Sequence, residues 1–214
     1  VLTLQQHLKQ GSFQPDDYEL SFRFAEDLDS IHVDLSEEEK MHLQGRIDRI
    51  DVSEDAEHVY VKVIDYKSGN KKFDLAALYY GLQLQLVVYM NAALELVEKK
   101  HPGKTAEPAG IFYYHVKHPM VDGLGYESEE EIRAAVFEQL KLNGVVNEKQ
   151  EIYRAMDTDF SGNSSIIPVG EKADGSLKAT SKVLSTKDFE QIFSYVNKKI
   201  TETGKQIFAG DVSI

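Results

Sequence analysis

Two aspartates and a lysine in neighbouring parts of the chain have the types and the spacing to hold a divalent cation. The segment VYVKVIDYK, residues 59–67, alternates as a strand does, so Asp65 and Lys67 project from one face of it. Asp48 lies in the preceding strand-like segment, GRIDRID. Mg²⁺ takes oxygen ligands, usually one or two carboxylates with water and phosphate completing its shell. Asp48 and Asp65, with a backbone carbonyl near Tyr66, would suffice to bind it.

The aspartate and lysine two residues apart have a second interpretation. Such a pair at a strand end is also a common structural ion pair, and it gains weight here only because Asp48 lies in the partner strand. In a regular strand Asp51 faces away from Asp48, and we expect it at the surface or in a turn.

A glutamine and a tyrosine in the following helical segment could complete such a site. Gln85 and Tyr89 are four residues apart, so they share one face of a helix. Inside an apolar helix each side chain needs a hydrogen-bond partner, which could be the sheet beneath or the cation site. Gln83 projects from a different side of the helix and is a reserve candidate.

The hydrophobic pattern predicts which elements position these residues. Two strands separated by the polar SEDAE form a β-hairpin, and a long apolar helix that ends at His101-Pro102-Gly103 packs on the sheet. Glutamates after Ser128 give the capping-box pattern before another helix. We expect strands at 18–24, 31–35, 42–52, 58–66 and 108–116, helices at 2–8, 75–100, 129–142 and 186–208, and a turn-rich region at 143–182.

The length and composition indicate one globular domain. A chain of 214 residues, 42% hydrophobic and 28% charged, can bury one sizeable core of the α/β or α+β type. It has no cysteine, which excludes a disulfide framework, a thiolate metal site and a catalytic thiol. No apolar run approaches the roughly 20 residues that span a bilayer, and the start lacks the pattern of a secretion signal. We expect no membrane association, and the start at Val1 suggests an excised fragment.

The order GRIDRID, VIDYKSG and QLQLVVYM resembles the RecB-like branch of the PD-(D/E)xK nucleases. That branch has an aspartate after a glycine in one strand, Asp-x-Lys in the next and Gln-x-x-x-Tyr in the following helix. The resemblance implies one α/β domain over residues 1–214, a restriction-endonuclease-like core with a central mixed β-sheet flanked by helices. It also implies catalytic roles for Asp48, Asp65, Lys67, Gln85 and Tyr89, and Mg²⁺ ligands from Asp48, Asp65 and Tyr66.

The similarity extends to the C-terminal part of the AddB-type subunits of bacterial ATP-dependent helicase/deoxyribonucleases. It runs through GSFQPDDYELSF, LNGVVNEKQEIYRAMD and ITETGKQIFAGDVSI. The resemblance implies an exonuclease-type, Mg²⁺-dependent deoxyribonuclease domain in a cytoplasmic complex that processes DNA ends for double-strand break repair by homologous recombination. The implied partners are DNA and an AddA-type helicase–nuclease subunit, in a heterodimer.

Two features depart from that family. Its cysteines hold an iron-sulfur cluster, which we expect in the full-length family protein but not in this cysteine-free fragment. Its branch also places a histidine on a helix well upstream of the first aspartate, which we expect before Val1. None of the seven histidines of this chain is a good replacement. His7 and His32 lack the flanking residues of that motif, and His115 and His118 have the spacing of a zinc pair but no third ligand in view, so we expect structural or surface roles for these four.

The net charge of −12 opposes nonspecific DNA binding, because attraction to phosphate dominates such binding. We hypothesise that a larger complex delivers the DNA, and that a local positive rim arises from Arg49, Lys62, Lys71 and Lys72. The alternative is a catalytically silent interaction module in which Asp65 and Lys67 are merely paired. A third interpretation is a stand-alone nuclease of the same branch, of the CRISPR-associated or restriction type.

Overall fold

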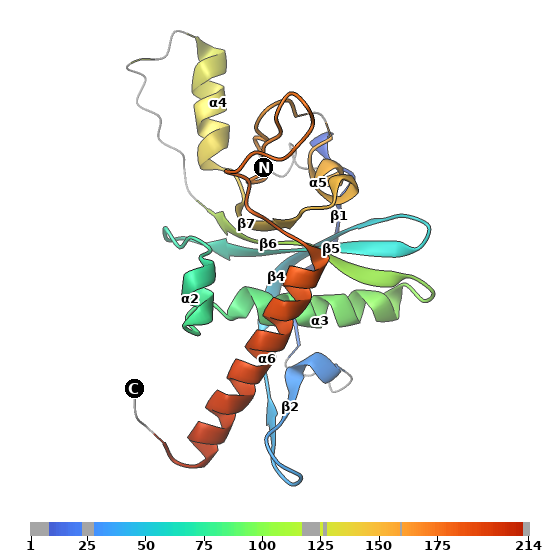
Figure 1. Ribbon diagram of the computed structural model, residues 1–214, viewed down its shortest axis with the longest axis vertical. Coiled ribbons are helices and arrows are strands. Elements are labelled where there is room, and N and C mark those ends of the chain that lie inside the picture. The colour runs from blue at the N-terminus through green and yellow to red at the C-terminus, as the bar shows by residue number, and fades with distance from the viewer. Residues whose placement is uncertain (1–8, 23–27, 117–124, 126–127, 159, 212–214) are drawn as a thin grey trace.

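A mixed six-stranded sheet forms the centre of the computed structural model, which describes residues 9–22, 28–116, 125, 128–158 and 160–211. The strand order is β1-β4-β5-β6-β7-β8, and helices lie on both sides of the sheet (Figure 1). This confirms the predicted α/β class. The six strands are β1 (Gln14–Ser21), β4 (Arg46–Glu54), β5 (His58–Lys67), β6 (Thr105–His115), β7 (Asn143–Asn147) and β8 (Val183–Leu184). The short helix expected at 2–8 lies outside the described residues.

The predicted hairpin is present as the antiparallel pair β4–β5. Its register runs from Glu54 opposite Val59 to Arg49 opposite Ile64. β5 then pairs in parallel with β6, so it is a central strand and is buried on both faces along most of its length, as its apolar composition requires. The first strand of the hairpin begins later than predicted, because residues 40–42 belong to a separate two-stranded sheet of β2 (His32–Asp34) and β3 (Lys40–His42).

The single helix predicted over 75–100 is wrong. The structure has α2 (Leu75–Tyr79) and α3 (Gln85–Lys100), separated by a turn. Gly81 adopts a φ of 80°, and its amide and that of Leu82 bond the carbonyls of Leu78 and Ala77, which is the Schellman arrangement that ends a helix. Gln83 therefore lies in the connection and not on a helix face.

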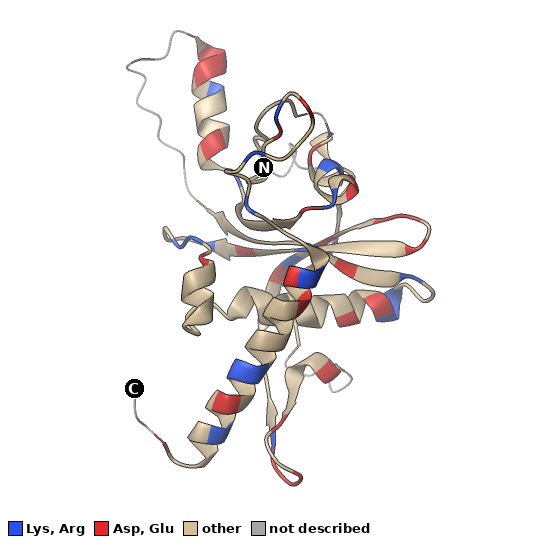
Figure 2. Ribbon diagram, in the orientation of Figure 1, with Lys and Arg blue, Asp and Glu red and all other residues tan. Residues whose placement is uncertain are grey.

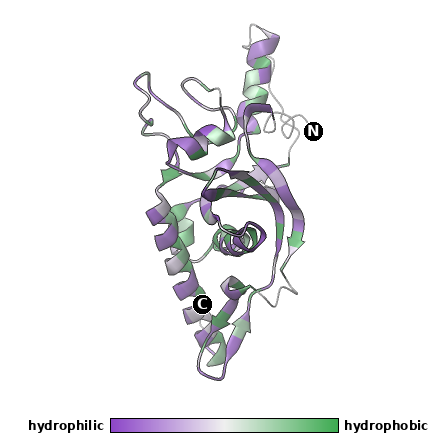
Figure 3. Cartoon of the chain, turned by 90° about the vertical axis from the view of Figure 1, so that its right-hand side faces the viewer, coloured by the Kyte–Doolittle hydropathy of each residue, from purple (hydrophilic) through white to green (hydrophobic). Residues whose placement is uncertain are grey.

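Two apolar layers sandwich the sheet. α3 and α6 (Thr186–Phe208) cover one face, and Figure 3 shows α3 almost end-on within the curve of the sheet. The other face packs against α5 (Gln150–Met156) and the loop after it. α6 has the predicted bounds, with Ser185 and Asp188 forming a capping box at its start. The packing of α3 and α6 against the apolar side chains of β4 and β5 therefore fixes the strands that carry Asp48, Asp65 and Lys67.

The remaining elements differ in extent from those predicted. α4 (Glu129–Gln139) ends earlier than expected, buries no residue and projects from the body of the molecule (Figure 1). A short 3₁₀ helix, η1 (Asp29–Ile31), precedes β2. The turn-rich region 143–182 contains β7 and α5, which the sequence pattern did not predict. Among the described residues no helix is both long and apolar enough to cross a membrane.

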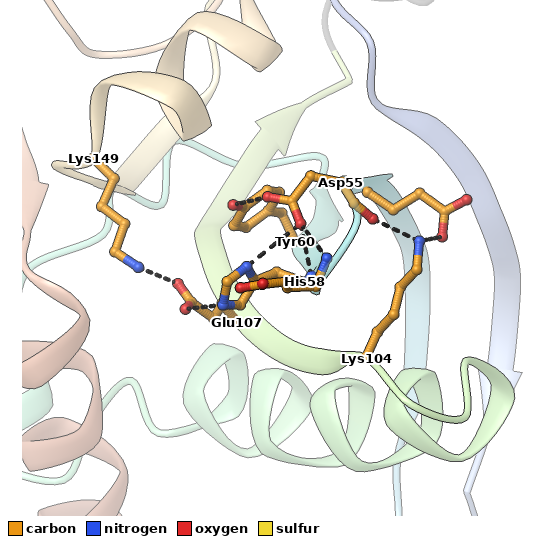
Figure 4. Close-up of polar contacts among 8 residues, drawn as sticks. Asp55, His58, Tyr60, Lys104, Glu107 and Lys149 are labelled. Atoms are coloured by element: carbon orange, nitrogen blue, oxygen red, sulfur yellow. Dashed lines mark hydrogen bonds and ion pairs between the residues drawn. The ribbon is translucent and has the colours of Figure 1, made fainter.

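The turn of the hairpin, at the far end of β5 from Asp65, is fixed by a polar network (Figure 4). Asp55 accepts the amides of Glu57 and His58 and the hydroxyl of Tyr60, the last at 2.6 Å. The imidazole of His58 lies 3.5 Å from Glu107 on β6, which in turn pairs with Lys149 at 2.6 Å. These contacts tie the hairpin to β6 and to the start of α5, so they anchor the strands that carry the candidate site.

Candidate active site

The two aspartates meet where β4 begins and β5 ends. The register that places Arg49 opposite Ile64 brings Asp48 to the level of Asp65, on the face covered by α3. Asp48 accepts a hydrogen bond of 2.8 Å from the backbone amide of Tyr66. Asp65 itself is only 2% exposed. The structure therefore brings the two predicted carboxylates together.

The lysine and the helix residues form a chain of polar contacts beside Asp65. Lys67 Nζ lies 2.5 Å from Asp65 Oδ2 and donates to Gln85 Oε1 at 3.2 Å. Gln85 Nε2 in turn donates to the Tyr89 hydroxyl at 2.7 Å. The lysine side chain remains 25% exposed, so it is accessible from solvent while α3 fixes its position. Asp65, Lys67, Gln85 and Tyr89 thus form one chain of contacts, and Asp48 lies beside it on the backbone amide of Tyr66.

Two buried oxygens of the cluster have no hydrogen-bond partner among the described residues. Asp65 Oδ2 is close to Lys67 but outside hydrogen-bond geometry, and it is buried without another partner. Burial raises the pKa of Asp65 and the nearby Asp48 adds to this, while Lys67 and Lys71 oppose it. The hydroxyl of Tyr113, the register partner of Asp65 on β6, is also buried and without a partner. A buried carboxylate oxygen whose one close partner is the ammonium group of Lys67 still has lone pairs for a cation or an ordered water.

Tyr113 is a residue of the site that sequence reasoning missed. Burial raises its pKa to about 12, with Asp65 and Tyr89 contributing through their charges. Its ring lies below two ammonium groups, with Lys67 Nζ 5.6 Å and Lys71 Nζ 5.2 Å from the centroid. In the sequence Tyr113 is one more apolar-type residue of a buried strand. The only signal that could have found it is the parallel pairing of β5 with β6.

The donor set fits a hard divalent cation better than zinc. Within the described ranges, no group of three or more His, Cys, Asp or Glu residues could hold a metal ion. Structural and catalytic zinc sites use three or four such ligands. Mg²⁺ keeps several waters and is commonly bound through one or two carboxylates and phosphate. Asp48 and Asp65 match that requirement, and the carbonyl of Tyr66 as a further ligand stays a prediction.

Gly45, three residues before Asp48, is required by close packing. A Cβ atom at this position would lie 2.4 Å from Phe22 Cζ and 2.9 Å from Tyr89 Cε1. The two rings meet edge to face, with centroids 5.7 Å apart. The glycine therefore lets the chain pass the ring of Tyr89, whose hydroxyl holds Gln85.

The expectation that Asp51 lies at the surface or in a turn is wrong. Asp51 is 0% exposed and binds Arg49 Nε and Nη2 at 2.5 and 2.7 Å and Lys62 Nζ at 2.9 Å. Alternation places these three residues on the face covered by α5, where a buried carboxylate needs cationic partners. Lys62 also lies 4.9 Å from the ring centroid of Phe13.

The prediction that Arg49 and Lys62 belong to a positive rim of the site is wrong, because both are part of this buried ion cluster. Arg49 and Lys62 are each 3% exposed and point away from the site, so they cannot line it. Lys71 and Lys72, which follow β5, are exposed. The spacing of Arg49 and Asp51 on one strand face, with Lys62 opposite Asp51 in the hairpin, was the signal for this ion cluster.

The described histidines do not contribute to the carboxylate cluster. His32 and His42 pack edge to face, with ring centroids 4.4 Å apart, in the separate β2–β3 sheet. His115 Nε2 donates to the carbonyl of Lys71 at 2.7 Å. His7 and His118 lie outside the described residues.

Comparison with known proteins identifies relatives along the whole chain. The family described as the PD-(D/E)XK nuclease superfamily matches residues 1–214. The B subunit of the ATP-dependent helicase/deoxyribonuclease of Alkaliphilus metalliredigens is 38% identical over 213 residues, 99% of this chain and 18% of the relative. The protein of the same name from Clostridium tetani is 39% identical over 211 residues, which are 99% of this chain and 18% of that relative. The protein of this name from a Thermoanaerobacter species is 36% identical over 214 residues, which are 100% of this chain and 18% of that relative. The chain thus spans less than a fifth of the length of these relatives.

Proposed function

The chain belongs to the PD-(D/E)XK nuclease superfamily, and on that premise we propose that it is the Mg²⁺-dependent deoxyribonuclease domain of the B-type subunit of a helicase/deoxyribonuclease. The observation that carries this proposal is the convergence of Asp48, Asp65 and Lys67 on one face of the sheet, with Gln85 and Tyr89 behind the lysine.

Asp48 and Asp65 would hold the cation, with the carbonyl of Tyr66 as a third ligand. A bound divalent cation supplies Lewis-acid polarisation of the scissile phosphate and lowers the pKa of water. The amide of Tyr66 fixes Asp48 in advance, and burial fixes Asp65. The two carboxylates would therefore offer the cation a preformed pair of oxygen ligands.

Lys67 would act on the phosphate and on the attacking water. Its ammonium group is held by Asp65 and Gln85 but remains partly exposed, so it can donate to a phosphate oxygen where negative charge develops. The hydroxyl of Tyr89 accepts from Gln85 and so fixes the amide that orients the lysine. Burial around Asp65 lowers the local dielectric, which strengthens these charge interactions.

The names of the relatives suggest the setting in which the domain works. Those names give a subunit of a helicase/deoxyribonuclease. From the family resemblance of the sequence we further propose that the domain cuts DNA as an exonuclease, in a cytoplasmic complex with an AddA-type helicase–nuclease subunit, during the processing of double-strand breaks for homologous recombination. Acidic and basic side chains are interspersed over the described ribbon (Figure 2), and the net charge is −12. DNA would thus be delivered by other parts of the complex, and an iron-sulfur cluster would lie in another part of the full-length protein.

A second candidate is a catalytically silent interaction module in the same complex. It is favoured by the lack of a third His, Cys, Asp or Glu ligand among the described residues near Asp48 and Asp65. Exposed apolar side chains on α2, on its turn and at the end of α6 are also typical of an interface: Tyr79, Tyr80, Leu82, Ile207 and Phe208.

A cleavage assay separates the two candidates. The full subunit and the 214-residue chain are each incubated with end-labelled DNA and Mg²⁺, as wild type, as Asp65→Ala and as Asp34→Ala, an exposed control. The nuclease predicts cleavage that EDTA abolishes and that Asp65→Ala reduces by about 100-fold or more. Equal cleavage by wild type and Asp65→Ala would favour the interaction module.

A further inference from the structure

We propose that the segment 71–74 and the cavity next to it form a subsite for one nucleotide of single-stranded DNA, in which Lys71 and Lys72 bind phosphates beside the scissile bond. This inference rests on the proposed function and extends it to the substrate strand. It starts from Lys71, whose Nζ lies over the same Tyr113 ring as Lys67 Nζ, at 5.2 and 5.6 Å from the centroid.

The backbone of this segment is anchored at every residue although it has no regular secondary structure. His115 donates to the carbonyl of Lys71 at 2.7 Å, and Gln83 donates to that of Lys72 at 3.0 Å. The amide of Phe73 donates to Asn143 Oδ1 at 2.8 Å, and its ring is buried in the core. The amide of Asp74 donates to Gln83 Oε1, and the Asp74 side chain caps α2.

The anchors come from three separate parts of the fold: the end of β6, the start of β7 and the turn before α3. These hydrogen bonds fix the backbone from which the side chains of Lys71 and Lys72 project. Lys71 and Lys72 are exposed, and neither forms an ion pair within the described part of the chain. Two neighbouring ammonium groups on an anchored backbone, without an ion-pair partner among the described residues, are suited to bind phosphate.

A polar cavity of about 620 Å³ lies next to this segment. Its carboxylate, Glu138, is paired with Lys141 at 3.3 Å, so the lining keeps the positive charge of Lys72. The volume falls in the range of about 300–1,000 Å³ that holds small ligands. A nucleotide is of this size and a duplex is not. The residues that would contact the nucleotide are Lys72, His115, Lys141, Asn143, Asn163 and Thr180.

Lys71 and Lys72 thus give a direction to the substrate strand. Lys71 lies over the Tyr113 ring together with Lys67, and Lys72 lines the cavity. A strand cut beside Asp48 and Asp65 would pass from Lys71 to Lys72 and place its next nucleotide in the cavity.

The test is binding of fluorescein-labelled oligothymidylate to the 214-residue chain in EDTA, where no cleavage interferes, measured by anisotropy over a range of salt concentrations. We expect Lys71→Gln and Lys72→Gln each to lower the slope of log affinity against log salt by about 0.7, the value for one lost phosphate contact on a single strand. Lys40→Gln, an exposed lysine on β3, should keep the wild-type slope.

A second pair of variants tests the cavity itself. Thr180→Glu introduces a negative charge into the lining and should weaken binding about five- to tenfold at low salt. Thr203→Glu makes the same change on an exposed position of α6 and should have no effect. Melting temperatures of all variants should stay near that of the wild type, because the changed side chains are exposed.

The subsite is overturned if Lys71→Gln and Lys72→Gln keep the wild-type slope, or if the wild-type chain shows no binding even at the lowest salt. These outcomes are separate from failure of the proposed function. Cleavage that depends on Asp65 with unchanged binding in both lysine variants would leave the nuclease and remove the subsite. Binding that depends on Lys71, without any cleavage by the full subunit, would support the subsite and remove the proposed nuclease activity.

Discussion

The carboxylate of Asp48 accepts a hydrogen bond of 2.8 Å from the backbone amide of Tyr66, the residue that follows Asp65. The position of Asp48 is thus fixed by the backbone of the neighbouring strand and not by its own rotamer alone. A carboxylate held in this way loses little freedom when it binds a cation, which is the preorganisation that such sites require. The end of β5 therefore positions both acidic ligands at once.

Gln85 should influence the rate and not the binding of DNA. Gln85→Ala removes the acceptor that holds Lys67 at 3.2 Å, so the lysine is less well oriented toward the phosphate. We expect kcat to fall about 10- to 100-fold with a KM within about twofold of wild type. Steady-state cleavage measures both values. The control is Gln191→Ala, which changes an exposed glutamine on α6. A kcat of Gln85→Ala equal to that of the wild type would refute the claim that Gln85 orients Lys67.

Gly45→Ala should lower the stability of the fold. The added methyl group would lie 2.4 Å from Phe22 Cζ and 2.9 Å from Tyr89 Cε1, so a buried ring must move. We expect a loss of about 1–3 kcal/mol in the free energy of unfolding, measured in urea. Gly69→Ala is the matched control, because a Cβ atom there meets nothing within 4 Å. Equal stability of the two variants would contradict this account of Gly45.

Asp51→Ala should destabilise the fold without changing the chemistry. It leaves Arg49 and Lys62 buried without their shared carboxylate, and losing one partner of a buried ion cluster costs about 3–5 kcal/mol. The cluster lies on the opposite face of the sheet from Asp65, so the cleavage rate per folded molecule should be unchanged. Urea unfolding measures the stability, and the cleavage rate divided by the folded fraction measures the chemistry. A loss below about 1 kcal/mol would show that the cluster contributes little.

Glu95 should make stability depend on acid pH. Burial opposes its ionisation, but Lys99 and the amides of Ser30 and Asp29 outweigh this and lower the pKa of Glu95 to about 2 from its ordinary 4.5. The stabilisation is therefore complete above pH 4.5 and is lost as the pH falls toward 2.

The variant Glu95→Gln measures this effect. It should be less stable than wild type by about 1–3 kcal/mol at pH 7, and the difference should close near pH 2. Glu98→Gln, an exposed change on the same helix, should show no such trend. A difference for Glu95→Gln that does not vary with pH would show that its carboxylate charge is not the cause.

The candidate site was predictable because its geometry is local. Strand alternation places Asp65 and Lys67 on one face, the hairpin brings Asp48 beside them, and helical spacing pairs Gln85 with Tyr89. Each of these inferences needs only neighbouring segments of the chain. The resemblance to a nuclease family rested on the same residues, and the family match supports it.

Other features could not be predicted from the sequence, chiefly because they depend on contacts between segments that are far apart in it. Asp51 is buried because α5 and the loop after it cover its face of the sheet, and nothing near Asp51 in the sequence predicts that cover. The site role of Tyr113 depends on the parallel pairing of β6 with β5. Gly81 interrupts an apolar pattern that otherwise fits one helix, and only its left-handed backbone shows the break.

The most direct measurement is cation binding by the carboxylate pair, followed through Tb³⁺ luminescence sensitised by nearby tyrosines and displaced by Mg²⁺. Asp48→Asn and Asp65→Asn should each weaken Tb³⁺ binding by about 100-fold or more, since each removes a ligand. Asp34→Asn, an exposed change on β2, should bind as wild type does. The same affinity in all four proteins would contradict the claim that Asp48 and Asp65 hold a divalent cation together.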